Sequence, residues 1–203
     1  MKIKKIKFIY FDIGGVLVDH VSALKKIANE LKISEEKVIA LFAKHCDEID
    51  RGTLPWKDFE SIFYNKLSPS SKLKTCFLES FVNNFEKIKE THNLIHELKD
   101  KFDIGIISNV AKDAFRLVKS KNLIPNIDYK AVVKSAEIKF IKPEKEIFDY
   151  ALTQANVSQN EILFIDDNEI NAKAVKSFGW NSVLFNTQNP SKSIKKIKKI
   201  LSN

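Results

Sequence analysis

The chain has 203 residues, 44% of them hydrophobic and 30% charged, and a formal net charge of +8. This composition is ordinary for a globular protein, and no run approaches the roughly 20 apolar residues that a membrane span requires. The lysines are scattered over nearly every predicted helix, which favours a solvated basic surface over a nucleic-acid partner. A positive field of this kind would still attract an anionic substrate.

The first seven residues and the two cysteines bear on where the protein works. Residues 1–7 are basic, but the apolar segment after them contains Asp12 and two glycines and leads to no small-residue cleavage site. It therefore does not resemble a signal peptide. Cys46 and Cys76 lack CxxC spacing, which predicts two buried thiols in a reducing compartment. We expect a cytoplasmic protein.

The first half of the chain predicts one strand followed by a run of helices. Residues 5–11 form a short apolar strand that ends at Asp12. Apolar residues at helical spacing then predict helices over residues 21–31, 34–46, 56–67 and 73–81. Four successive helices between two strands predict an inserted helical cap domain at residues 18–85.

From residue 88 onward, the pattern alternates between helices and strands. Strands are predicted at 103–107, 129–133, 161–165 and 182–185, and helices at 88–101, 112–121, from Pro143 onward and at 169–178. This alternation predicts an α/β fold with a doubly wound parallel sheet, a Rossmann-like core domain made of residues 1–17 and 86–203. The last segment predicts an amphipathic helix, which we expect to cover the sheet; a membrane-surface or partner helix is the alternative.

Three of the apolar runs end abruptly in polar residues that suit phosphate chemistry. Asp12 follows the first strand, Ser108 follows the second, and Asp166 and Asp167 follow residues 162–165. Ligands of open α/β sheets bind beyond the carboxyl ends of the strands. These side chains, which are distant in sequence, are therefore expected to meet in one pocket.

Asp12 lies where a strand ends and a glycine pair begins. The chain has only five glycines, so Gly14 and Gly15 together indicate a demand for unusual backbone angles or for amides close to an anion. A carboxylate at this position can act as a nucleophile that accepts a phosphoryl or acyl group. The alternative is an Asx turn at the end of a strand.

Asp166 and Asp167 are adjacent carboxylates, which repel each other unless a cation lies between them. Oxygen ligands of this kind favour Mg²⁺, which takes one or two carboxylates together with substrate phosphate. The alternative is that Asp167 or Asn168 caps the helix that follows. Capping explains one polar residue and leaves the other unexplained, so the metal site is the favoured interpretation.

Ser108 and Asn109 precede a predicted helix, where a hydroxyl and backbone amides can bind an anion. Helix capping by Ser108 explains the same spacing equally well. Lys142 precedes Pro143, which holds its backbone extended and allows its ammonium group to be aimed at a point charge. Among 34 basic residues, however, a single lysine is weak support by itself.

Four segments in this order resemble the four motifs of the haloacid dehalogenase (HAD)-like hydrolase superfamily. The segments are residues 11–19 (FDIGGVLVD), 107–109 (ISN), 142–143 (KP) and 164–168 (FIDDN). The resemblance covers residues 5–185 and is closest to the subgroup with a small helical cap, which includes bacterial sugar-phosphate phosphatases such as glucose-1-phosphate phosphatase. The turn at residues 51–53 (RGT) is similar to a turn in those caps.

The resemblance implies a role for each motif residue. Asp12 would attack phosphorus and form an aspartyl-phosphate, with Lys142 offsetting its charge. The implied ligands of Mg²⁺ are Asp12, the carbonyl of Gly14, Asp166 and Asp167. The implied phosphate-binding residues are Ser108, Asn109 and Lys142. A cation and a lysine would stabilise the charge that a transferring phosphoryl group carries.

One position departs from the pattern of the superfamily. Most of its phosphatases carry a second aspartate two residues after the nucleophile, where this chain has Gly14. Loss of a general acid/base can lower a rate by about 10²–10⁴-fold. The sugar-phosphatase subgroup also lacks this aspartate, so activity remains expected. Candidate replacements in this chain are Asp19, His20, His45 and Asp47.

The function that we expect is a Mg²⁺-dependent phosphatase acting on a small phosphorylated metabolite. The missing aspartate argues against a phosphomutase, and the Asp166-Asp167 pair argues against a haloalkanoate dehalogenase, which needs no metal. The alternative from another class is a catalytically weak or silent domain of this superfamily that binds an anionic or nucleic-acid partner.

Overall fold

The structure is a computed structural model that describes residues 5–202. At its centre is a five-stranded parallel sheet with the strand order β5-β4-β1-β6-β7. Its strands are β1 (Phe8–Phe11), β4 (Asp103–Ser108), β5 (Ala131–Lys134), β6 (Ile162–Asp166) and β7 (Asn181–Leu184). The predicted α/β fold with a parallel sheet is confirmed. Residues 1–4 and 203, at the outer limits of the predicted core domain, lie outside the described part.

The central strand β1 is hydrophobic at every position and lies between β4 and β6, whose polar residues stand only at the strand ends. Phe11 is opposite Ile106 of β4 and Ile165 of β6, so these three strands end at the same edge of the sheet. All four residues of β1 are fully buried, as expected for a strand covered on both faces. The register therefore brings the residues that follow β1, β4 and β6 to one place.

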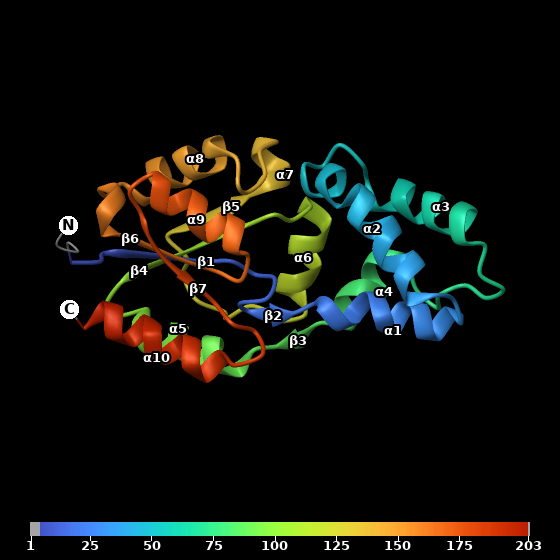
Figure 1. The fold of residues 1–203 in the computed structure, drawn as a ribbon, viewed down its shortest axis with the longest axis horizontal. Helices are drawn as coiled ribbons and strands as arrows, with labels where there is room; N and C mark the ends of the chain where they lie inside the picture. Colours follow the sequence, from blue (N-terminus) through green and yellow to red (C-terminus); the bar gives the residue numbers. More distant parts are fainter. Residues whose placement is uncertain (1–4, 203) are drawn as a thin grey trace.

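Helices cover both faces of the sheet (Figure 1). On one face lie α5 (Lys89–Leu98), α6 (Lys112–Ser120) and α10 (Pro190–Leu201), which contribute to one apolar cluster with β1, β4 and β6. On the other face lie α8 (Lys145–Ala155) and α9 (Glu169–Ser177). The terminal helix α10 buries Ile197 against this core, which confirms that it covers the sheet.

The segment between β1 and α5 contains four helices that pack on one another. They are α1 (Val21–Leu31), α2 (Glu35–Asp50), α3 (Trp56–Leu67) and α4 (Phe77–Asn83). Their shared core is strongly aromatic, with Phe59, Phe63 and Phe77 fully buried. This group extends from one end of the sheet, away from both chain termini (Figure 1).

A short two-stranded antiparallel ribbon connects the four helices to the sheet. It consists of β2 (Val18–Asp19) and β3 (Glu86–Lys87), which sequence analysis did not predict. Strands of two residues are too short to show a periodic pattern, so no sequence signal distinguishes them from a loop. The ribbon places the entry and exit of the helical segment side by side.

Two predicted helix starts are wrong. The helix expected from residue 73 begins at Phe77, because the backbone amides of Leu73 and Phe77 bond to the Tyr64 hydroxyl and the Glu60 carboxylate of α3. The helix expected from Pro143 begins at Lys145, after a turn. A further short helix, α7 (Ser135–Ile138), was not predicted at all.

The expectation of two buried thiols is also wrong. Cys76 is exposed, and Cys46 is partly exposed on α2. Both thiols are free. Among residues 5–202, no helix is both long and apolar enough to cross a membrane.

Candidate functional site

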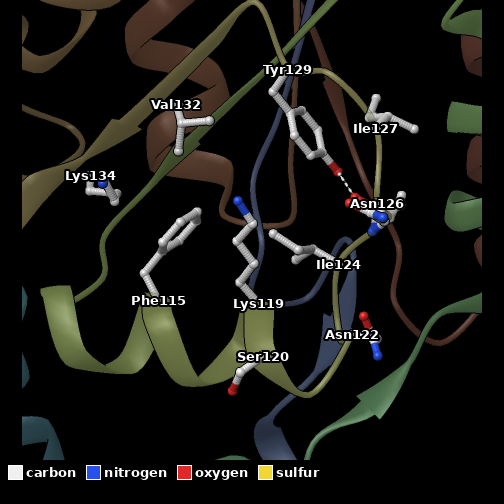
Figure 2. A pocket seen from close by; sticks show the side chains of 11 residues that line it. Phe115, Lys119, Ser120, Asn122, Ile124, Asn126, Ile127, Tyr129, Val132 and Lys134 are labelled. Carbon is white, nitrogen blue, oxygen red and sulfur yellow. Dashed lines mark hydrogen bonds between the residues drawn. The ribbon is translucent and has the colours of Figure 1, made fainter.

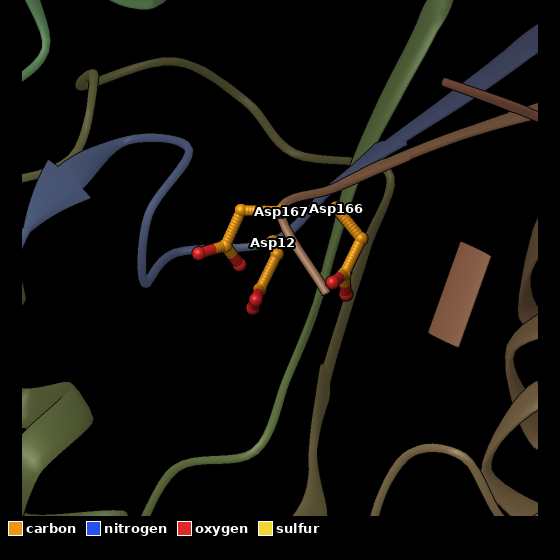
Figure 3. Close-up of side chains that lie close together, drawn as sticks. All are labelled: Asp12, Asp166 and Asp167. Carbon is orange, nitrogen blue, oxygen red and sulfur yellow. The ribbon is translucent and has the colours of Figure 1, made fainter. Parts of the chain in front are cut away.

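Three carboxylates meet at the edge where β1, β4 and β6 end. Asp12 directly follows β1, Asp166 is the last residue of β6, and Asp167 follows it. One oxygen of each lies within 4.8 Å of the others, and Figure 3 shows the three side chains converging from the two strand ends. Asp166 is fully buried and Asp12 nearly so. The three aspartates lie together, as predicted, because β1 and β6 end at the same edge of the sheet.

The ammonium group of Lys142 lies between two of these carboxylates. Its Nζ atom is 2.8 Å from Asp12 Oδ2 and 2.7 Å from Asp166 Oδ2, and the side chain is almost fully buried. Burial alone would lower the pKa of Lys142, but the two carboxylates raise it above its ordinary value. Lys142 is therefore a fixed positive charge beside Asp12.

Asn109 holds the backbone of Lys142 in place from the end of β4. Its Oδ1 atom accepts from the Lys142 amide at 2.7 Å, and its Nδ2 atom donates to the Lys142 carbonyl at 3.1 Å. The Asn109 side chain therefore positions Lys142. The backbone amide of Asn109 is not used by these two bonds, and the expectation that Asn109 binds phosphate stays a prediction.

The Asp166 carboxylate is saturated with hydrogen-bond donors. Its Oδ1 atom accepts from the Asn168 amide at 2.7 Å, and Asn171 Nδ2 lies 3.2 Å from both oxygens. Together with Lys142, these donors compensate a buried charge that would otherwise be costly. Asp166 is thus a fixed support for Lys142 as well as a neighbour of Asp12.

Asp167 has a different environment from that of its neighbour. Asn168, and not Asp167, caps α9, since Asn168 Oδ1 accepts from the Ile170 amide at 2.8 Å. Burial, followed by the charges of Asp12 and Asp166, raises the pKa of Asp167 to about 7. The capping alternative therefore leaves Asp167 unexplained, and its carboxylate is held where a cation would relieve repulsion.

Gly15 makes room for the Asp167 carboxylate. It has a φ of +67°, and a Cβ atom at Gly15 would lie 1.9 Å from Asp167 Oδ2. The Thr187 hydroxyl also donates to the Gly15 carbonyl at 2.6 Å, which fixes this turn. The glycine is therefore required both by its backbone angle and by the carboxylate that occupies the space.

Ser108 is buried at the end of β4 and hydrogen-bonds to the Asp12 carboxylate. Burial and the charge of Asp166 raise the pKa of Asp12, and the bond from Ser108 lowers it. The alternative role of Ser108 as a helix cap is wrong, because α6 begins at Lys112 with Ala111 before it. Its hydroxyl is instead directed to the carboxylate.

Gly14 has no positive φ, so its backbone could accept a side chain. The His20 ring, however, occupies the space that this side chain would need. A Cβ atom there would lie 2.9 Å from Cε1 of the His20 ring. Of the four candidate replacements for the missing aspartate, only His20 lines the cavity beside Gly14. The Asp19 carboxylate accepts from the Val21 amide, and His45 pairs with Glu48 on α2.

A cavity of about 130 Å³ lies between the strand ends and the helices α2, α3 and α4. Gly14, His20 and Ser108 line it together with two residues that sequence analysis missed, Asp50 and Trp56. Both flank the turn at residues 51–53, whose resemblance to cap turns was the only available signal. Helical periodicity does not show which polar residue of a helix faces a neighbouring domain.

A larger hollow of about 510 Å³ lies elsewhere, between α6 and the edge strand β5 (Figure 2). Its lining includes Lys119, Lys134 and Tyr129, whose hydroxyl donates to the Pro125 carbonyl at 3.0 Å. None of the predicted site residues borders this hollow. The cluster of charged groups at the strand ends therefore identifies the candidate active site, where the cavity of about 130 Å³ lies beside Gly14 and a hollow of about 550 Å³ borders Asp167.

Comparison with known proteins agrees with this geometry. The family model described as haloacid dehalogenase-like hydrolase matches residues 9–185. Among curated proteins, none matches the sequence significantly.

Solved structures share the fold at low sequence identity. A predicted HAD-like family hydrolase from Porphyromonas gingivalis has a TM-score of 0.78 at 18% identity, covering 98% of this chain and 100% of its own. A HAD family enzyme from Bacteroides thetaiotaomicron, in complex with magnesium and inorganic phosphate, has a TM-score of 0.67 at 23% identity, covering 87% and 92%. L-2-haloacid dehalogenase from Xanthobacter autotrophicus has a TM-score of 0.66 at 18% identity, covering 87% and 76%.

The contact between Gly15 and Asp167 leads to a stability prediction. Gly15→Ala should destabilise the protein by clearly more than Gly179→Ala. Gly179 also has a positive φ, +84°, but its Cβ would meet only the flexible end of Gln159, at 3.2 Å. Gly179→Ala should therefore cost about 1–2 kcal/mol from backbone strain alone. Urea unfolding measures both variants, and equal losses would show that Asp167 does not constrain the turn.

Proposed function

The chain belongs to the haloacid dehalogenase-like hydrolase family, and we propose that within it this protein is a Mg²⁺-dependent phosphatase acting on a small phosphorylated metabolite. The observation that carries the proposal is the grouping of Asp12, Asp166 and Asp167 within 4.8 Å, with Lys142 bonded to two of them. Such a group combines a nucleophile, a cation site and a fixed positive charge.

The donor set suits Mg²⁺. One lysine pairs with two of the three carboxylates, which leaves excess negative charge, and every carboxylate ligand atom is an oxygen. Asp167, whose repulsion from its neighbours is the least compensated, is the proposed direct ligand together with Asp12 and the Gly14 carbonyl. Asp166, saturated by its own donors, would take part through water. Bound Mg²⁺ would supply positive charge to the phosphoryl oxygens and hold them in place.

The residues of the site perform a two-step hydrolysis in this proposal. The Asp12 carboxylate attacks phosphorus, the ester bond breaks, and the leaving oxygen keeps the electron pair and takes a proton from water. Water then attacks the aspartyl-phosphate, which releases inorganic phosphate and restores Asp12. Lys142 keeps Asp12 ionised, and it binds the phosphoryl oxygens together with Ser108 and the backbone amide of Asn109.

We propose that residues 18–85 act as the cap over this site. The turn at the end of α2 is bonded to the core: Arg51 pairs with Glu144, and Lys139 Nζ donates to the carbonyls of Arg51 and Gly52 at 3.1 and 3.3 Å. These bonds join the helical segment to the core. A closed cap excludes water and completes the surroundings of the substrate.

Phosphoryl transfer suits the site better than dehalogenation, although one similar fold is that of a dehalogenase. A haloacid has no phosphoryl oxygens for a cation to bind. Dehalogenation therefore does not explain why the third carboxylate, Asp167, is present. In support, the Bacteroides thetaiotaomicron enzyme of the same fold is described with magnesium and inorganic phosphate.

Replacement of the nucleophile tests the reaction. Asp12→Asn should lower the hydrolysis of acetyl phosphate by about 10³-fold or more, because an amide cannot form the acyl phosphate. The wild-type protein, but not the variant, should also gain one phosphoryl group in a mass spectrum after rapid quenching. Asp19→Asn is the matched control and should retain its rate, because the Asp19 side chain caps the Val21 amide instead. An active Asp12→Asn variant would refute the assignment.

Replacement of Asp167 tests the metal site without requiring turnover. Asp167→Ala should weaken the binding of Mg²⁺ by more than about tenfold in calorimetry on the resting protein, because it removes a direct oxygen ligand. Asp128→Ala, which removes an exposed carboxylate far from the site, should leave the affinity unchanged. Equal affinity in wild-type protein and the Asp167→Ala variant would rule out this ligand set.

A further inference from the structure

The cavity beside Gly14 is the space that a leaving group would enter. It is bordered on the core side by Gly14 and Ser108, and on the other side by the helices α2, α3 and α4. Ser108 bonds to Asp12, so the cavity opens directly beside the proposed nucleophile. The walls are mostly apolar, with Phe42, Phe81 and Val110 among them.

Two residues that line this cavity each carry a buried polar atom without a partner. Across residues 5–202, three buried side-chain nitrogen or oxygen atoms have no hydrogen bond, and two of them, His20 Nδ1 and Trp56 Nε1, belong to residues that line the cavity. Trp56 is only 9% exposed. Buried polar atoms in folded proteins are nearly always hydrogen-bonded, so a ligand is a direct explanation for this pair.

Asp50 adds an acceptor at the same place. Its carboxylate lines the cavity and forms no ion pair or hydrogen bond to another side chain in the described part of the chain. Its backbone is fixed, because the Ser135 hydroxyl donates to the Asp50 carbonyl at 2.6 Å. Burial, followed by the charge of Asp47, raises the pKa of Asp50 to about 7.

The size of the cavity limits what can fit in it. A volume of about 130 Å³ equals about four water molecules in the liquid, at about 30 Å³ each. A group of about four to six non-hydrogen atoms fills such a space, whereas a hexose has roughly twice as many. A leaving group that enters this cavity is therefore smaller than a hexose, despite the sequence resemblance to sugar-phosphate phosphatases.

We propose that the substrate is the phosphate monoester of a two- to four-carbon alcohol with at least one further hydroxyl group, which bonds to Trp56, His20 and Asp50. The proposal rests on the phosphatase function argued above. The indole N–H donates to a hydroxyl oxygen, the hydroxyl proton is donated to Asp50 or His20, and the apolar walls contact the carbon chain. A site built to bond a hydroxyl group rejects the analogue that lacks it.

A matched pair of substrates tests the hydroxyl contact. Glycerol 3-phosphate and 1-propyl phosphate have the same chain length and differ in their hydroxyl groups. For the wild-type protein, kcat/KM for glycerol 3-phosphate should exceed that for 1-propyl phosphate by at least tenfold, and glucose 6-phosphate should be the poorest of the three. Equal values for the pair, or a preference for glucose 6-phosphate, would overturn the proposal.

Variants connect this preference to the cavity. Trp56→Phe keeps an aromatic ring but removes the N–H group, and should reduce the ratio of the two kcat/KM values about tenfold; Asp50→Asn should also reduce it. Trp180→Phe is the matched control, because Trp180 is buried in the core against Tyr10, and it should leave the ratio unchanged. An unchanged ratio in both Trp56→Phe and Asp50→Asn would refute this assignment.

Acetyl phosphate separates the two proposals. Its phosphoryl group is activated, and its small leaving group needs no hydroxyl contact. Absence of Asp12-dependent hydrolysis of acetyl phosphate would refute the phosphatase function itself. Hydrolysis of acetyl phosphate without discrimination between glycerol 3-phosphate and 1-propyl phosphate would preserve that function and overturn the substrate class alone.

Discussion

The ion pairs of Lys142 are the interaction on which the site depends. The parallel register forces Asp12 and Asp166 to the same edge of the sheet, where burial makes two unpaired carboxylates costly. Lys142 bonds to both, and Asn109 fixes its backbone through two hydrogen bonds. The second carboxylate of the pair, Asp167, receives no such partner. The remaining negative charge is what suits the site to a metal ion.

The fixed charge cluster and the four helices α1–α4 belong to different parts of the fold. The aromatic core of α1–α4 nevertheless includes Val110, Ala111 and Ala114, which lie at the start of α6. The two parts are also joined by the ribbon β2–β3 and by the ion pair of Arg51 with Glu144. The charge of the site is therefore set at the strand ends, whereas the shape of the cavity beside Gly14 depends on how α1–α4 pack against α6.

The sequence was most informative about residues that directly follow, or end, a buried strand. Asp12, Ser108 and Asp166 were predictable because each terminates an apolar run, and a parallel sheet brings such ends together. Side-chain partners were not predictable in this way. Nothing in the spacing shows that Asn109 bonds to the backbone of Lys142, or that Asn168 rather than Asp167 caps α9. The contribution of Asp50 depends on how α2 docks on the core, which is a tertiary property.

The glycine pair shows how one short motif serves two separate requirements. Gly15 has a left-handed backbone, and the Asp167 carboxylate occupies the space where a side chain of residue 15 would lie. Gly15 therefore belongs to the charge cluster. Gly14 has an ordinary φ and yields its space to His20, so it belongs to the cavity. An aspartate at Gly14 would collide with the His20 ring unless that ring moved. The departure from the usual family motif is thus coupled to His20, the residue directly before α1, because the two positions share one space.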